Sequence, residues 1–101
     1  MRTEVQNRIK MLRDIVTAEV APSTPGRRAW MQLGPAEGER VALVEFEHDA
    51  RLNTDGYPGP QDILDRRQTE FDTLEDALAS LAARSIDTDL FDAPWKTDYP
   101  L

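Results

Sequence analysis

His48 is the only histidine of the chain, and its side chain is the one best suited to acid–base chemistry near neutral pH. A catalytic histidine needs a partner that orients its ring. Asp49 follows it directly, but adjacent residues of a strand point to opposite faces, so this carboxylate is poorly placed. Asp55 or Tyr57 in the following loop would have to orient the ring, and no serine lies nearby in the sequence as a nucleophile. The pattern favours an exposed histidine at a strand end.

The segment 51–62 matches part of a calcium-binding loop. Its matching residues, at positions three, five, six and twelve, are Asn53, Asp55, Gly56 and Asp62. Position one is Arg51, a cation where the motif needs a carboxylate. The run Asn-Thr-Asp-Gly is more typical of a turn whose side chains bond their own backbone. The glycines of the chain form no phosphate-binding cluster either, so we expect neither a metal nor another cofactor.

Residues 87–101 combine large apolar side chains with acids and follow neither helical nor strand periodicity. Two interpretations remain open. In one, this tail folds back and covers the exposed side of the sheet, where Val41 and Leu43 offer apolar surface. In the other, its aromatic side chains insert into a partner protein, as interface hot spots do, and its aspartates attract a basic surface. The partner-binding residues are then Asp87, Asp89, Leu90, Phe91, Asp92, Trp95 and Tyr99.

The negative charge is concentrated in the last third of the chain. The whole sequence has a net charge of −7, and residues 69–101 hold eight acids against two bases, a net charge of −6. Such a surface repels nucleic acid and anionic membranes and attracts a basic protein. A charge of this size also serves solubility alone.

Length and composition predict one small domain. The chain has 101 residues, of which 40% are hydrophobic and 31% charged. We expect that domain over residues 1–86, followed by the tail at 87–101. Without cysteine there is no disulfide, thiolate metal site or cysteine nucleophile. Charges interrupt any signal-peptide or membrane-spanning run, so the expected location is the cytoplasm.

The spacing of apolar residues predicts a helix over residues 3–20. They recur at intervals of three and four, which places one stripe on the helix: Val5, Ile9, Leu12, Val16 and Val20. Prolines and a glycine at 22–26 end this helix. We expect the stripe to face the core, with a homodimer seam as the alternative.

Three strands and a second helix are predicted downstream. Segments 28–33 and 40–48 form a hairpin across a connection rich in turn formers, and 67–71 is the third strand. Thr73 begins the helix, with Asp76 three residues later as in a capping box.

Alternation in the segment 40–48 separates two faces of the strand. We expect the face of Ala42, Val44 and Phe46 to point to the core. The fold class is then α+β, with a small antiparallel sheet of about three strands packed against N-terminal and C-terminal helices, in the order α-β-β-β-α, and an extended C-terminal tail.

These observations favour a non-catalytic, acidic protein-binding domain, because no convincing catalytic set is present. It would act as an inhibitor or immunity-type protein, or as an accessory subunit of a larger complex, on a partner with a basic surface. The alternative is a small-molecule-binding protein or small enzyme, with a pocket near the 49–60 loop that uses His48, Asp55 and Tyr57.

Overall fold

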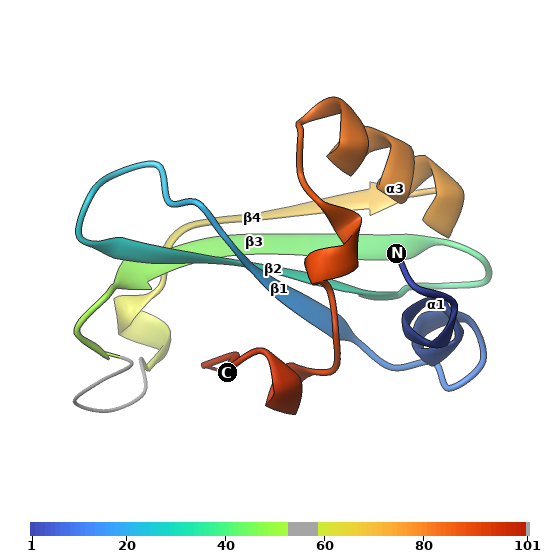
Figure 1. Cartoon of the computed structure of the whole chain (residues 1–101), viewed down its shortest axis with the longest axis horizontal. Coiled ribbons are helices and arrows are strands. Elements are labelled where there is room, and N and C mark those ends of the chain that lie inside the picture. The colour runs from blue at the N-terminus through green and yellow to red at the C-terminus, as the bar shows by residue number, and fades with distance from the viewer. Residues whose placement is uncertain (53–58, 101) are drawn as a thin grey trace.

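The computed structural model describes residues 1–52 and 59–100. The elements of the described residues are α1 (Thr3–Lys10), β1 (Val16–Val20), β2 (Arg27–Pro35), β3 (Val41–Asp49), η1 (Pro60–Asp62), β4 (Leu64–Phe71), α3 (Leu74–Ala83), η2 (Thr88–Leu90) and η3 (Pro94–Lys96). The strands form one antiparallel sheet in the order β1-β2-β3-β4 (Figure 1). The α+β class is confirmed, with the order α-β-β-β-β-α in place of the expected α-β-β-β-α.

The first helix is shorter than its apolar spacing predicted. α1 ends at Lys10, and Arg13 has a φ of 56°, which a continuing right-handed helix does not permit. The expected second half of the helix is strand β1, where β-branched side chains favour extended backbone. Leu12, expected in the core, is 70% exposed. The prediction was wrong because Val16 and Val20 fit a strand alternation as well as a helical stripe.

The predicted hairpin is confirmed as β2 and β3, but the prediction for the core-facing side of β3 was wrong. The helices cover the face that carries Val41 and Leu43, both of which are buried in the main hydrophobic core. Alternation identifies the two faces of a strand, but it does not decide which one the helices cover when both are apolar.

The main core lies between this face and the two helices. Val5 and Ile9 of α1 are buried in it, so the predicted stripe is internal in its first half. α3 begins as predicted, because the Thr73 hydroxyl accepts a hydrogen bond from the Asp76 amide at 3.1 Å. Leu74, Ala77 and Leu81 of α3 complete the core.

A second, smaller core lies on the opposite face of the sheet. Trp30 and Phe46 project there from β2 and β3, and the Tyr99 ring packs edge-on against both, with centroids 5.8 Å apart in each pair. The Tyr99 hydroxyl donates to Gln32 Oε1 at 2.9 Å. Burial raises the pKa of Tyr99 to about 12, so this donor keeps its proton at neutral pH.

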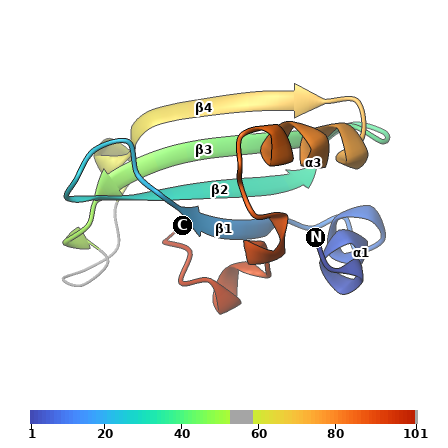
Figure 2. The ribbon, with the colours of Figure 1, turned by 45° about the horizontal axis from the view of Figure 1, so that its top comes forward.

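The C-terminal segment reaches both cores because it crosses the outer edge of β1 (Figure 2). Thr17 and Asp92 form an antiparallel bridge there, with backbone N–H···O distances of 2.8 and 3.0 Å. Phe91, just before the bridge, is buried in the main core with Val41 and Leu43. Tyr99, after it, is buried on the other face. The segment 91–99 therefore wraps around the β1 edge, and we refer to it as the clasp.

Replacement of Phe91 with alanine is expected to lower the free energy of unfolding by about 3–5 kcal/mol, because it removes a fully buried ring from the main core. Urea denaturation followed by circular dichroism measures this change. The matched control is Leu90→Ala, at a half-exposed neighbour, for which the expected change is within about 0.5 kcal/mol. Equal effects of the two substitutions would contradict the clasp.

Candidate functional site

His48 is fully buried, so the prediction of an exposed histidine was wrong. The Trp30 indole N–H donates to His48 Nε2 at 2.9 Å, and the His48 Nδ1 lies 2.7 Å from the Asp49 carbonyl oxygen. Since an indole can only donate, Nε2 is the acceptor and the proton is on Nδ1, which donates to that carbonyl. Both ring nitrogens are occupied within the fold, and His48 is therefore a structural residue of the second core.

The residues predicted to form a ligand pocket with His48 do not complete one here. Asp55 and Tyr57 lie outside the described residues. A shallow cavity of about 570 Å³ does border the loop, lined by Pro25, Gly26, Arg27, Asp49, Ala50, Arg51 and Leu64. In it, hydrogen bonds from the Arg51 side chain and backbone lower the pKa of Asp49 to about 2. This carboxylate is held ionised by its neighbour and is unsuited to proton transfer near neutral pH.

A groove with more apolar side chains lies on the helix-bearing face, at the end of the sheet that neither helix covers. This groove has a volume of about 490 Å³, and Val20, Ala29, Met31 and Ile86 supply its apolar side chains. Its size is within the usual range for a small-molecule site. Sequence reasoning missed it, because the groove exists only where β1, β2, β3 and the segment after α3 meet.

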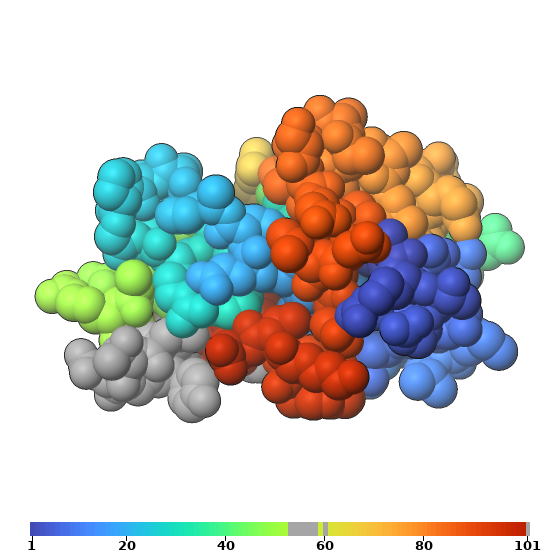
Figure 3. Space-filling view, in the orientation of Figure 1, coloured from blue at the N-terminus to red at the C-terminus, as the bar shows by residue number. Residues whose placement is uncertain are grey.

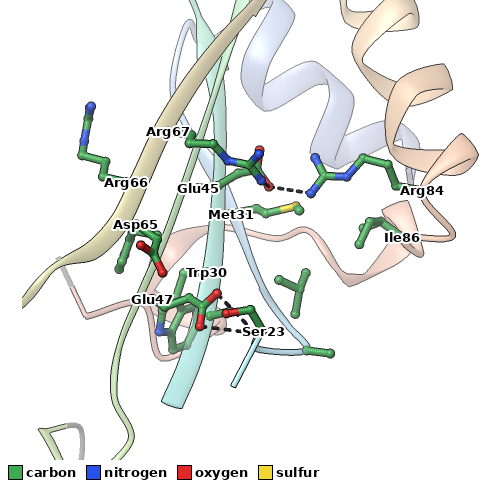
Figure 4. A pocket seen from close by; sticks show the side chains of 14 residues that line it. Ser23, Trp30, Met31, Glu45, Glu47, Asp65, Arg66, Arg67, Arg84 and Ile86 are labelled. Atoms are coloured by element: carbon green, nitrogen blue, oxygen red, sulfur yellow. Dashed lines mark hydrogen bonds and ion pairs between the residues drawn. The ribbon is translucent and has the colours of Figure 1, made fainter. Parts of the chain in front are cut away.

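Two glutamates of β3 line this groove, and each is held by other groups (Figure 4). Glu45 lies between two arginines, 2.6 Å from the Arg84 guanidinium and 3.7 Å from that of Arg67. Glu47 accepts a hydrogen bond from the Ser23 amide at 3.2 Å and lies 3.7 Å from Arg27. The groove therefore has apolar side chains at its base, and the charges of its two glutamates are balanced by neighbouring groups.

The structure divides the seven predicted partner-binding residues into two groups. Phe91 and Tyr99 are buried, and the Asp92 carboxylate pairs with Arg2 and accepts from the Ala93 amide at 2.8 Å. Leu90 and Trp95 are exposed, and so are Asp87 and Asp89. Asp87 caps η2 by accepting from the Asp89 amide at 2.9 Å. Of the seven predicted residues, only the second group is exposed.

Trp95 is the largest exposed apolar side chain among the described residues, and it is held in place. Its ring, 70% exposed, lies against the Arg8 guanidinium at 4.5 Å from the ring centroid. Arg8 is fixed in turn, because it donates to the Ile15 carbonyl at 2.8 Å and to Asp14 at 3.0 Å. Figure 3 shows the C-terminal segment directly against the N-terminal one.

Two further apolar side chains follow Arg8 at the end of α1. Met11 is 74% exposed, and Leu12, two residues beyond the last residue of α1, is 70% exposed. We refer to Arg8, Met11, Leu12 and Trp95 as the α1–η3 surface. Sequence reasoning identified Trp95 but placed Leu12 in the core. The polar pair Arg13-Asp14 before the β-branched run at 15–17 was the available signal that the helix ends early.

No group of three or more acidic, histidine or cysteine side chains within residues 1–52 and 59–100 is arranged to hold a metal ion. Over the same ranges, no helix has both the length and the apolar character to cross a membrane. No protein-family model matches the chain, and no curated protein or solved structure is detectably similar to it.

The structural role of His48 is tested by His48→Phe. This change leaves the Trp30 indole N–H and the Asp49 carbonyl without their partner, and the expected cost is about 1–3 kcal/mol in the free energy of unfolding. His48→Gln, which keeps an acceptor, should lose less. Urea denaturation of the three proteins gives the order, and a His48→Phe protein as stable as the wild type would disprove the role.

Asp92 makes the clasp sensitive to acid. The hydrogen bond from the Ala93 amide, and then the Arg2 guanidinium, hold the pKa of Asp92 below its ordinary value of 3.8. A lowered pKa in the folded state stabilises the protein above the ordinary value, and this stabilisation is lost as the pH falls through the folded-state pKa. Asp92→Asn should therefore lower stability by about 1 kcal/mol at pH 7 and by progressively less as the pH falls below 3.8.

Thermal unfolding of both proteins between pH 7 and pH 2 measures this difference in Tm. Glu37→Gln, at an exposed position in the β2–β3 turn, is the control for loss of one carboxylate. A difference between wild type and Asp92→Asn that does not shrink on acidification would contradict the assignment.

Proposed function

We propose that this protein is a non-catalytic protein-binding domain, acting as an inhibitor or accessory subunit, that docks its partner at the α1–η3 surface. The observation that carries the proposal is Trp95, a largely exposed tryptophan fixed on Arg8. A tryptophan held in one orientation loses little side-chain entropy on binding, and tryptophan is enriched among interface hot spots. Met11 and Leu12 are exposed apolar side chains just after α1, the helix that carries Arg8.

Charge supports a basic partner. Asp87 and Asp89 are exposed acids just before Leu90, in the part of the chain that carries the net charge of −6, and the Asp89 carboxylate lies 3.1 Å from the N-terminal ammonium. Complementary charge at the margin of an interface speeds association and excludes acidic competitors. The described carboxylates and the histidine support a role without catalysis, since His48 is buried and Glu45, Glu47 and Asp49 are paired.

The groove favours a second candidate function, binding of a small molecule. Its apolar floor and its volume of about 490 Å³ fit a compact apolar ligand with a polar group directed to Arg67 or Arg84. This site replaces the predicted one around His48, whose ring is enclosed. Saturable quenching of Trp30 fluorescence by such a ligand would support this candidate.

Trp95→Ala is the decisive variant for partner binding. We expect it to weaken binding of the partner captured from the producing cells by about 30-fold or more, the size of a hot-spot loss. Calorimetry with the purified partner measures the Kd, which should also rise with salt if the aspartates contribute. Thr24→Ala in the β1–β2 connection, exposed and at the opposite end of the sheet from α1, is the control. An unchanged Kd for the Trp95→Ala protein would refute the proposal.

A further inference from the structure

The two edges of the sheet are treated differently by the chain. At the β1 edge, the tail bridges Thr17 through Asp92. At the other edge, β4 is the last strand in the order, and no other strand of the described ranges pairs with its outer side (Figure 2). An unpaired edge exposes a row of backbone donors and acceptors that another strand can use.

β4 is unusual because its interior is entirely polar and exposed: Asp65, Arg66, Arg67, Gln68, Thr69 and Glu70. Charges on an edge commonly prevent pairing with other chains. Here, however, their order is self-complementary. A cation at Arg66 and an anion at Glu70 stand at equal distances on either side of Gln68. A strand with that symmetry attracts an antiparallel copy of itself.

Strand geometry leaves few registers for such a pair. In a two-fold antiparallel pair, residues that face each other must point to the same side of the sheet. The two-fold axis therefore lies midway between the two copies of one residue, which face each other. An axis at Arg67 opposes two arginines. An axis at Thr69 places Arg67 opposite Phe71. An axis at Gln68 places Arg66 opposite Glu70 twice and Arg67 opposite Thr69. In this register Asp65 would face Phe71, but Asp65 has a φ of 53° at a β-bulge, where the regular part of β4 ends.

Both charges of this register are available in the single chain. Arg66 forms no ion pair with any described residue, and its hydrogen bond to the Gln68 side chain is long, at 3.3 Å. Glu70 lies 3.8 Å from Arg40, which is closer to Asp72, at 2.9 Å. Arg67 points to the other face, where it pairs with Glu45. Pairing through β4 therefore adds two ion pairs and breaks no strong one.

We propose that two copies of the chain associate through β4, antiparallel and centred on Gln68, so that one continuous sheet runs across both. The contact is small, so the expected Kd is micromolar, typical of weak interfaces. Because β1 and β4 are opposite edges, the β1-edge clasp stays outside this contact.

Sedimentation equilibrium over a concentration series tests the association. The expected mass rises from one 11.4 kDa chain toward two with concentration. Glu70→Arg opposes arginine to arginine and Arg66→Glu opposes glutamate to glutamate, so each should abolish the dimer. The double variant Arg66→Glu with Glu70→Arg restores opposite charges and should dimerise again. Glu39→Arg, an equal charge change in the β2–β3 turn, is the control and should have no effect.

Cross-linking tests the register. The chain has no cysteine, so a Gln68→Cys protein can form only the disulfide between two copies. Residues directly opposite in an antiparallel pair have Cα atoms about 4.5–5.5 Å apart, within disulfide range. Thr69→Cys is the matched control, because its two copies would be offset by two residues along the strands, which puts their Cα atoms about 8 Å apart, too far to bridge.

A disulfide-linked dimer from Gln68→Cys and none from Thr69→Cys is the expected result. A protein that is monomeric at every concentration, a dimer insensitive to the single charge changes, or equal cross-linking of the two cysteine variants would each overturn the proposal. A dimer lost on Leu12→Ala but retained in Glu70→Arg would place the contact on the α1–η3 surface instead.

Discussion

The fold depends on covering a sheet that has large apolar side chains on both faces. Both helices pack on one face, with Leu43 and its neighbours, and leave Trp30 and Phe46 on the other without a helix. One stretch of chain serves both faces because the Thr17–Asp92 bridge lets it turn around the β1 edge. Phe91 and Tyr99, on either side of this bridge, are for that reason buried in different cores.

This requirement also explains which tail residues are left for binding. The side chains that serve the two cores cannot reach a partner, and the acid at the bridge is engaged by Arg2. The residues that remain exposed are those around η2, with Leu90, and Trp95 on η3, which lies against Arg8 of α1. The exposure of Trp95 is thus a consequence of how the tail is anchored.

Local signals in the sequence were enough for α3 and the β2–β3 hairpin. The Thr73 cap and the turn formers act within a few residues, so their effect can be read without the rest of the fold. β1 was missed because Val16 and Val20 satisfy two periodicities, and only the backbone at Arg13 decides between them. The burial of His48 depends on Trp30 of the neighbouring strand, a contact that no short-range pattern contains.

The candidate site was predictable in part for the same reason. Trp95 was identified as a tail anchor from its type, while Leu12 was hidden in an apparent helical stripe. The groove with Glu45 and Glu47 is assembled from four separate segments, so its arginine partners could not be paired in advance. Residue spacing predicts single helices and strands well, but it predicts contacts between side chains of different elements poorly.

The bridge between Thr17 and Asp92 also sets the order in which the protein can fold. β1 is made early during synthesis, but the core on each face of the sheet lacks one aromatic ring, Phe91 or Tyr99, until the segment 91–99 has been made. Until then the nascent chain exposes Trp30 and Phe46, the kind of surface that chaperones bind. Contacts between residues so far apart in sequence also slow folding. Both cores are therefore complete only once the segment 91–99 has joined β1.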